Sequence, residues 1–265
     1  MNIVTFPGLN LSFEVSKIAF TIFGISVYKY AVCIVLGIVL ALILSKIAKQ
    51  KFDIEYNDVL ICTVLGIIFG TIGARLYYVI FNLSYYSQNI SEIFDFRNGG
   101  LAIYGGLILG AITILVYCKI RKINVLNLFD YVVPYVALAQ CIGRLGNFFN
   151  VEAYGAQTMS IFRMGIRTVE GYIEVHPVFF YELVATLIIF IVLKILQNHR
   201  KFEGQIFGLY CLLYSGIRFF LEGIRADSLM LFNFRASQVL SLVIFVCSIV
   251  YIIIKTKKDS KTENK

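Results

Sequence analysis

The residues best suited to chemistry lie in a short window, 143–155, at the end of an apolar stretch. Arg144, Asn147, Asn150 and Glu152 fall within nine residues of it. Glycines separate them and leave room for close approach of a ligand. They are Gly143, Gly146 and Gly155. Ionisable groups at membrane depth are costly and usually mark a functional site. A helix end with a snorkelling arginine is the alternative, but the neighbouring amides and carboxylate favour a site.

A second cluster combines two glycine pairs with a tyrosine. Its members are Gly99, Gly100, Tyr104, Gly105 and Gly106. Successive backbone N–H groups of paired glycines can cradle an anion, and Tyr104 would hold a phenol near the membrane surface. An aromatic-belt tyrosine between packing glycines explains this segment, taken alone, equally well.

A third cluster has helical spacing. Its members are Tyr214, Arg218, Glu222 and Arg225. Their spacing of four, four and three residues places all the side chains along one face of a helix. Arg218 and Glu222 can then pair, which lowers the cost of holding the arginine in the membrane. The alternative is a helix-stabilising ion-pair stripe, but a stripe that faces lipid would not be charged.

Three further segments contribute one or two candidates each. Pro177 suits a first helical turn, so His176 would lie just before a membrane helix and Glu182 inside it. An unpaired carboxylate there would be protonated or would need a cation, so we expect Glu182 to pair with an arginine from another span. Tyr30 opens the first apolar stretch, where an aromatic belt is the stronger interpretation. Arg75 lies within or near the outer half of the second stretch.

These residues need a membrane scaffold, and the composition supplies one. Hydrophobic residues make up 59% of the chain, against roughly 45–50% in soluble domains. Seven apolar stretches approach or exceed the ~17–25 residues that cross the hydrocarbon core. They are 31–47, 59–81, 101–117, 126–142, 178–196, 206–221 and 239–254. We therefore predict an all-α integral membrane protein with seven transmembrane helices. The fourth stretch is the weakest because it contains Asp130, Pro134 and Gln140, and we expect Asp130 to be structural.

Outside the spans, we expect one integral-membrane domain over residues 1–265 with small appendages. The longest outward loop, about 144–177, would form a small extracytoplasmic cap with a short hairpin near 171–175. Residues 1–24 lack the basic region of a signal peptide and would lie as an amphiphilic segment at the membrane surface. The basic tail, about 255–265, would fray in the cytoplasm.

Basic residues are sorted by type along the chain. Those after the first, third, fifth and seventh spans are mostly Lys, which fits cytoplasmic loops and a cytoplasmic C-terminus. The others are mostly Arg, which grips phosphate or carboxylate at two points. We therefore expect an anionic lipid headgroup at the outer leaflet. The net charge of +8 is thus largely topological and requires no nucleic-acid partner. Cysteine and histidine show no metal-ligand spacing, so no metal or cofactor is expected.

The window 143–155 resembles, at every fixed position, the signature of bacterial phosphatidylglycerol–prolipoprotein diacylglyceryl transferases. Three further blocks match in the order of that family. They are Gly99-Gly100-Leu101 with Tyr104-Gly105-Gly106, His176-Pro177 with Tyr181-Glu182, and Tyr214, Arg218, Glu222 and Arg225. The resemblance runs from about Tyr30 to Arg225, and the thirteen-residue signature is its most specific part.

The resemblance implies a seven-span enzyme of the bacterial cell membrane, with its active site toward the outer face. It would move a diacylglyceryl group from phosphatidylglycerol to the lipobox cysteine thiol of a prolipoprotein. A thioether would form and glycerol phosphate would be released. By match to the motif, Arg144 and Arg218 would hold the phosphate, while Asn147, Glu152 and Gly155 would shape the site. No cofactor is implied.

We therefore predict catalytic roles for Arg144, Arg218, Tyr104 and Glu152. Substrate-binding roles are predicted for the other members of these clusters. They are Tyr30, Arg75, Gly99, Gly100, Gly105, Gly106, Asn147, Asn150, Gly155, His176, Glu182, Tyr214, Glu222 and Arg225. Tyr104 stands where many relatives carry histidine. A free tyrosine, with a pKa of about 10, is a poor base at neutral pH, so the residues leave the general base open.

Two other functions fit parts of the pattern. A transporter or flippase for an anionic lipid would also use arginines, but it predicts charged residues spread across the membrane depth. Here they gather on one side. A non-catalytic lipid-binding membrane protein could use the arginines alone, but it gives no reason for so many polar spacings in one site.

Overall fold

A computed structural model describes residues 2–47, 52–96, 99–169, 171–226, 228, 230–231 and 234–263. The chain forms two compact units, one of residues 1–49 with 129–265 and the other of residues 50–128. Each unit is described by itself below.

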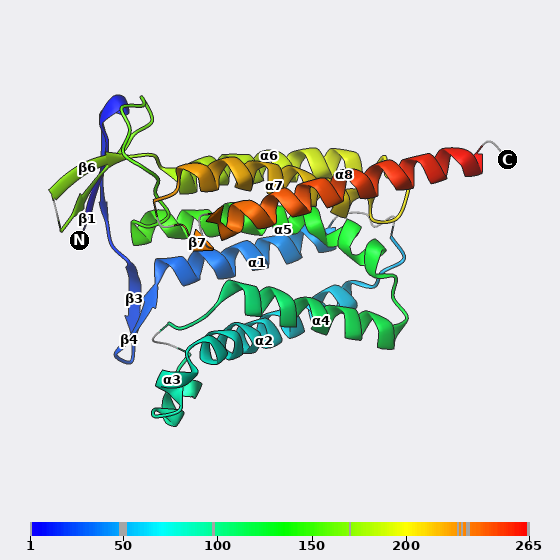
Figure 1. The fold of residues 1–265 in the computed structure, drawn as a ribbon, viewed down its shortest axis with the longest axis horizontal. Helices are drawn as coiled ribbons and strands as arrows, with labels where there is room; N and C mark the ends of the chain where they lie inside the picture. The colour runs from blue at the N-terminus through cyan, green and yellow to red at the C-terminus, as the bar shows by residue number, and fades with distance from the viewer. Residues whose placement is uncertain are drawn as a thin grey trace. The chain divides into compact units, whose positions relative to one another are not determined.

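Helices dominate the structure (Figure 1). The seven long ones are α1 (Lys29–Ile47), α2 (Tyr56–Phe81), α4 (Ile103–Arg121), α5 (Val125–Asn150), α6 (Val178–Gln197), α7 (Gln205–Ile224) and α8 (Ala236–Glu263). Within the described residues, each of the seven is long and apolar enough to cross a membrane. The seven predicted spans, including the weak stretch 126–142, are thereby confirmed.

The end of α5 differs from the expected loop boundary. The loop was expected from residue 144, whereas the helix continues through Asn150. Glycine weakens a helix by only about 1 kcal/mol per residue relative to alanine, and close packing offsets this at Gly146, where a Cβ would meet the Tyr30 ring. Left-handed backbone at Val151 and Ala153 follows the last helical residue. Arg144, Asn147 and Asn150 therefore lie in the last turns of α5, and Glu152 lies in the turn that follows it.

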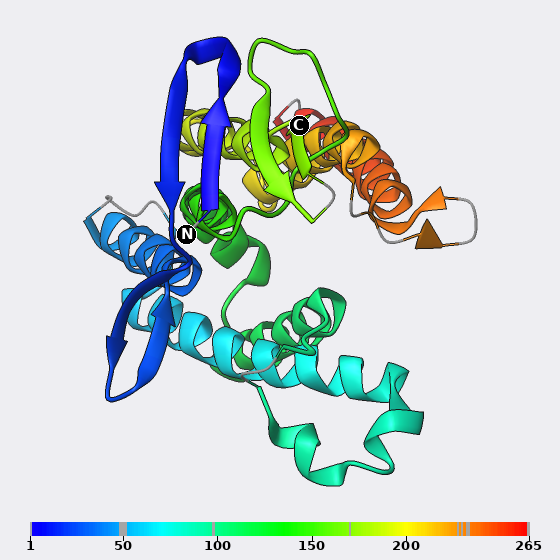
Figure 2. The ribbon, with the colours of Figure 1, turned by 90° about the vertical axis from the view of Figure 1, so that its left-hand side faces the viewer.

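The N-terminal residues, expected as an amphiphilic surface segment, form two antiparallel hairpins. In the first, β1 (Asn2–Phe6) pairs with β2 (Leu11–Val15), and β1 also pairs with β5 (Met164–Thr168), which pairs with β6 (Gly171–Val175). The sheet order is β2-β1-β5-β6, and the predicted hairpin near 171–175 is confirmed. In the second, β3 (Ile18–Ile22) and β4 (Ile25–Tyr28) pair with each other in a separate sheet that leads into α1 (Figure 2).

Two hydrophobic clusters support the first unit. One lies beneath the four-stranded sheet and joins Val4, Val15, Met164, Ile166, Val175 and Phe179. The other packs α5, α6 and α7 together through Val133, Ala137, Ile189, Leu193 and Ile206. The start of α1, the end of α5, the start of α6 and the end of α7 all lie beside the sheet (Figure 1). We call this the arginine end of the unit, because Arg144 and Arg218 lie there. We call the opposite end the lysine end, because Lys46 and Lys194 lie in the last turns of α1 and α6.

In the second unit, α2 and α4 pack closely through glycines. A Cβ on Gly70 would lie 3.5 Å from the Gly106 carbonyl oxygen, and Gly73 opposes Gly105 even more tightly. The small α3 (Leu83–Tyr86) and the 3-10 helix η2 (Ile90–Phe94) connect the two long helices. These glycines are therefore explained by helix packing.

Candidate active site

A buried glutamate on α6 joins two arginines from two other helices. Oε1 of Glu182 accepts a hydrogen bond from Arg144 Nη2 on α5 and one from the Tyr214 hydroxyl at 2.9 Å. Oε2 lies 3.2 Å from Arg218 Nη1 on α7. The predicted pairing of Glu182 with an arginine from another span is confirmed, and two arginines share the carboxylate.

The position of Glu182 follows from its helix. The buried face of α6 carries Val178, Glu182, Thr186, Ile189 and Leu193, whose spacing of three and four residues lines one side of a helix. A charged group in this otherwise largely apolar stripe must be paired. Since α6 starts at Val178, directly after Pro177, Glu182 is held little more than one turn from the arginine end.

A second carboxylate balances Arg218. Glu222 lies one turn further along α7, and its Oε2 is 2.6 Å from Arg218 Nη2, as predicted from the spacing. Within the described residues this oxygen accepts no aligned hydrogen bond, so proximity to the guanidinium balances its charge. Arg235, next to the start of α8, donates to the Glu222 backbone oxygen.

A chain of amides extends the network from Arg144. Arg144 Nη1 lies 3.4 Å from Asn147 Oδ1, and Asn147 Nδ2 donates to Glu152 Oε1 at 2.9 Å. Asn150 Nδ2 donates to the same oxygen at 3.2 Å. Because the left-handed turn after α5 folds Glu152 back against the helix, the four residues predicted from the 143–155 window form one connected group.

The two carboxylates that pair with the arginines are more deeply buried than the arginines themselves. The side chains of Glu182 and Glu222 are 2% exposed, whereas those of Arg144 and Arg218 are 23% and 17% exposed. A guanidinium carries five N–H donors. An anion that reaches this pair therefore meets the guanidinium groups before Glu182 and Glu222, an arrangement suited to phosphate. Glu152, at the edge of the network, is exposed.

Two glycines of the window are fixed by packing. A Cβ on Gly146 would lie 2.5 Å from the Tyr30 ring, so this glycine seats Tyr30 beside α5 next to Asn147. A Cβ on Gly155 would lie 2.6 Å from the Ile224 carbonyl oxygen and 2.9 Å from Val178 Cγ2. Gly155 therefore lets the start of α6 approach the end of α7, where it forms a β-bridge with Arg225.

His176 contributes mainly to the scaffold. Its backbone carbonyl accepts a hydrogen bond from the Gly155 N–H at 2.8 Å. Its ring nitrogen Nδ1 lies 3.2 Å from the Tyr181 hydroxyl. These contacts tie His176 to its own hairpin and helix start, so a role for this residue as base gains no support from them.

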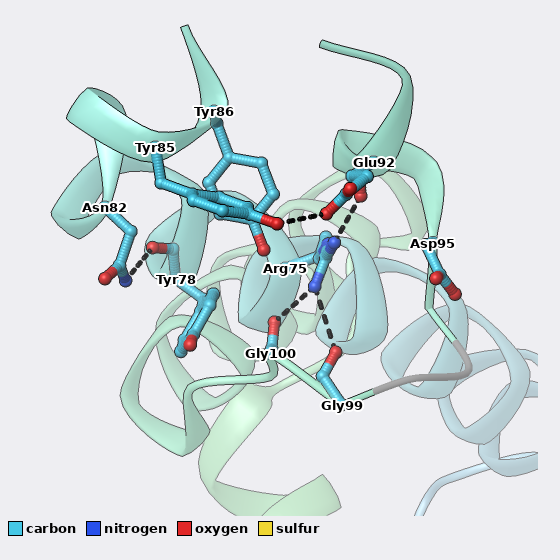
Figure 3. A pocket seen from close by; sticks show the side chains of 9 residues that line it. All are labelled: Arg75, Tyr78, Asn82, Tyr85, Tyr86, Glu92, Asp95, Gly99 and Gly100. Carbon is cyan, nitrogen blue, oxygen red and sulfur yellow. Dashed lines mark hydrogen bonds between the residues drawn. The ribbon is translucent and has the colours of Figure 1, made fainter. Parts of the chain in front are cut away.

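The remaining predicted residues belong to the second unit, where Arg75 organises a pocket of about 410 Å³ (Figure 3). Arg75 is buried, and it donates to the backbone oxygens of Glu92 at 2.5 Å, Ile93 at 2.9 Å, Gly99 at 2.9 Å and Gly100 at 3.0 Å. A guanidinium that engages four carbonyls acts as a structural clamp. These contacts favour that interpretation over the predicted substrate-binding role.

The glycine pair beside Arg75 is also structural. Gly100 has a φ of +68°, and a Cβ there would meet the Arg75 guanidinium and lie 3.0 Å from Tyr78, so a larger residue would not fit. The described contacts of Gly99 and Gly100 with Arg75 come from their carbonyl oxygens, whereas we expected their N–H groups to face an anion.

Across the pocket, the Tyr85 hydroxyl donates to Glu92 Oε2 at 2.8 Å, which raises the pKa of Tyr85. Tyr104 lies in the first turn of α4, partly buried.

The sequence interpretation missed a supporting pair behind Tyr214. Tyr210 stacks on Tyr214 with ring centroids 5.7 Å apart, and its hydroxyl lies 2.9 Å from Gln140 Oε1 on α5. The pair holds the Tyr214 hydroxyl toward Glu182. The spacing of four residues between two tyrosines next to the Arg218 cluster was the available signal.

The fold and the network define a class, namely a multi-pass membrane protein in which two arginines from different helices share one buried carboxylate. Comparison with known proteins makes the class specific. Residues 17–254 match the family model described as prolipoprotein diacylglyceryl transferase. The chain belongs to this family.

Several relatives carry the name phosphatidylglycerol–prolipoprotein diacylglyceryl transferase. The protein of Finegoldia magna is 41% identical over 94% of this chain and 99% of its own length. The protein of Clostridioides difficile is 44% identical over 92% and 96%, and that of Enterococcus faecalis 43% over 93% of each chain. The family predicted from the sequence is thus confirmed, and it favours a transferase over the transporter and the non-catalytic lipid-binding protein.

Proposed function

We propose that the Arg144–Glu182–Arg218 network binds the phosphate of phosphatidylglycerol during transfer of its diacylglyceryl group to a prolipoprotein. The chain is a diacylglyceryl transferase by family, and its relatives are named for these two substrates. The observation that carries the proposal is the shared buried carboxylate. It fixes two guanidinium groups from different helices side by side, each partly open to an incoming anion.

The chemistry requires charge stabilisation more than an enzyme nucleophile. The lipobox cysteine of the substrate supplies the sulfur, which reacts as a thiolate. The sulfur attacks the glyceryl carbon bonded to the phosphate oxygen, so an S–C bond forms while the C–O bond breaks. The electron pair leaves with the oxygen as glycerol phosphate. Arg144 and Arg218 would stabilise the charge that develops on this leaving group.

Glu182 would act as a positioning residue. Its two oxygens hold Arg144 and Arg218 at a fixed spacing, and Tyr214 fixes the carboxylate in turn. Fixed donors stabilise developing charge without reorganisation during the reaction. The chain of Asn147, Asn150 and Glu152 would orient Arg144 from its other side.

The thiol proton has two possible acceptors in this scheme. Tyr104 is the predicted catalytic phenol, but a phenol is a weak general base. The departing phosphate can itself take the proton. The scheme therefore assigns more of the rate to the two arginines than to Tyr104.

The proposed orientation places the arginine end at the outer face of the bacterial cell membrane and the C-terminus in the cytoplasm. Lys46, Lys194 and Lys255 lie toward the other ends of α1, α6 and α8. Lysine-rich helix ends are typical of the cytoplasmic side. A prolipoprotein that has crossed the membrane and a lipid of the outer leaflet would then both reach the arginines.

A direct test combines purified protein, phosphatidylglycerol and a synthetic lipobox peptide. We expect a gain in peptide mass equal to one diacylglyceryl group, together with released glycerol phosphate. A peptide with serine in place of the cysteine is the control and should give neither signal. Folded protein that binds phosphatidylglycerol but yields neither product would contradict the proposal and point to lipid binding or transport.

A further inference from the structure

The hairpin of β3 and β4 has one apolar face and one hydroxyl face. Residues paired across two antiparallel strands point to the same side, and successive residues alternate. The pairs Ile22↔Ile25 and Phe20↔Val27 therefore share one face, and the intervening pair Thr21↔Ser26 lies on the other. A hairpin with water on both faces would have no reason to place its apolar residues on one face and its hydroxyl residues on the other.

The first hairpin of the chain has a face that is covered in part. In the β1–β2 hairpin, the paired residues Val4 and Phe13 share one face. Val4 is fully buried in the cluster beneath the sheet, and Phe13 packs against the Phe148 ring while 42% exposed. In the β3–β4 hairpin, Phe20, Ile22 and Ile25 keep about half of their surface exposed. Within the described residues the two strands pair only with each other, and the exposure of these side chains shows that their face is open.

The turn of the β3–β4 hairpin carries its most unusual residue. Phe23 is 100% exposed and has a φ of +48°, followed by Gly24 at +78°. Two-residue turns of this kind favour Asn-Gly or Asp-Gly, and a bulky residue with positive φ is an outlier. Such outliers persist at functional positions. An aromatic ring at an exposed tip, held in a disfavoured conformation, indicates that the ring is used outside the folded chain.

The base of the hairpin joins a membrane span directly. β4 ends at Tyr28 and α1 begins at Lys29, and the backbone N–H of Lys29 donates to the Lys17 carbonyl at 2.8 Å. Two lysines therefore mark the level at which the hairpin leaves the span. The hairpin turns away from the axis of α1 at the arginine end (Figure 1), where lysine side chains can reach lipid phosphates.

We propose that the β3–β4 hairpin lies on the lipid bilayer beside the arginine end, with Phe20, Ile22, Ile25 and the Phe23 tip in the acyl boundary. The occupant of the apolar face is lipid, because the face continues from a transmembrane helix and ends in two lysines at headgroup level. Thr21 and Ser26 then face water. Amphipathic elements that lie in the interface bury their apolar face to a shallow depth.

The chain contains no tryptophan, so a single introduced tryptophan reports on its own surroundings. The Phe23→Trp protein is reconstituted into phosphatidylglycerol–phosphatidylcholine vesicles whose acyl chains carry bromine at a shallow or a deep position. We expect blue-shifted emission and loss of most of the signal with shallow bromine, and a smaller loss with deep bromine. Val169→Trp is the matched control. Val169 is as exposed as Phe23 and follows β5 directly, and its tryptophan should emit as in water with little quenching.

A second series keeps the test independent of the tip. Phe20→Trp and Ile22→Trp on the apolar face should be quenched, whereas Thr21→Trp on the hydroxyl face should not. Equal quenching at positions 21 and 22, or no quenching at 20, 22 and 23, overturns the proposal. Blue-shifted emission without bromine quenching also overturns it, since the face would then contact protein, such as a second copy of the chain. These readouts do not depend on transferase activity, so they stand apart from the function proposed above.

Discussion

The two ends of the α5–α7 bundle each bury a carboxylate against an arginine, yet they satisfy its charge differently. At the lysine end, Asp130 is fully buried and accepts hydrogen bonds from Arg200 at 3.0 Å and from the backbone N–H groups of Gly204 and Phe207 at 2.7 and 2.8 Å. At the arginine end, the described donors to Glu182 are all side chains, from α5 and α7.

The difference separates a structural carboxylate from one suited to a site. Backbone donors cannot turn away, so they hold Asp130 of α5 against the first turn of α7, in line with the structural role predicted for it. Side-chain donors can keep one bond to Glu182 and direct another toward a substrate. Both carboxylates are buried and paired with arginine, and the type of donor distinguishes them.

The largest difference between the ends should appear on removal of their arginines. Arg144→Ala and Arg218→Ala should each lower the rate of transfer by about 10²–10³, the usual loss for a donor to developing charge. Arg200→Ala at the lysine end is the matched control and should retain its rate when folded. Rates with phosphatidylglycerol and lipobox peptide, normalised to folded protein, provide the measurement.

Tyr104→Phe ranks below both arginine variants in the same assay, because the departing phosphate can accept the thiol proton. An equal or greater loss in folded Tyr104→Phe protein would reverse this ranking. It would assign the proton transfer to the phenol instead.

The next effect concerns the carboxylate that spaces the arginines. Glu182→Gln keeps the size of the side chain but removes charge-assisted bonds worth about 1.5–3 kcal/mol each. We expect a loss of kcat of about 10- to 100-fold, with the KM for the peptide unchanged. A variant that simply unfolds would lose all parameters together, so thermal unfolding in detergent accompanies the kinetics. An unaltered kcat in the Glu182→Gln protein would contradict the positioning role of Glu182.

The same substitution at the lysine end should change stability instead. Asp130→Asn leaves Arg200 and two backbone N–H groups with a weaker acceptor, at a cost of about 1–3 kcal/mol. The Tm should fall while kcat and KM of the folded fraction stay constant. A Tm that is unchanged together with slower transfer would mean that the two ends do not differ as described.

The smallest effect tests the support of Glu182. Tyr214→Phe removes one hydrogen bond to the carboxylate, worth about 0.5–1.5 kcal/mol, and keeps the ring that stacks on Tyr210. We expect a rate loss of only a few-fold. Tyr210→Phe, which loses its bond to Gln140 but not to Glu182, serves as the control and should have less effect on the rate.

Features that depend on residues close together in the sequence were predicted correctly, and features that depend on distant residues were not. The spans depend on local composition, and the Arg218–Glu222 pair on a spacing within one helix, so both were predictable. β1 pairs with β5 through Thr5 and Gly165. These residues are far apart in the sequence, so no local pattern predicts their pairing. For Glu182 the kind of partner followed from electrostatics, but the sharing by Arg144 and Arg218 depends on how three helices pack. The clamp around Arg75 depends on the direction of loop carbonyls, which composition does not encode.

Pro134 lies inside α5, between the Asp130 end and the Arg144 end. A proline lacks the N–H that would bond the carbonyl four residues earlier, which here belongs to Asp130. The side-chain amide of Gln197 on α6 donates to that carbonyl at 2.8 Å and to the Tyr131 carbonyl at 3.0 Å. Gln197 therefore joins the part of α5 that lacks a helical hydrogen bond to α6, the helix that carries Glu182. A bend of α5 at Pro134 would have to break the bonds of Gln197 as well as the apolar contacts between α5 and α6, so both sets of contacts help to hold Arg144 near Glu182.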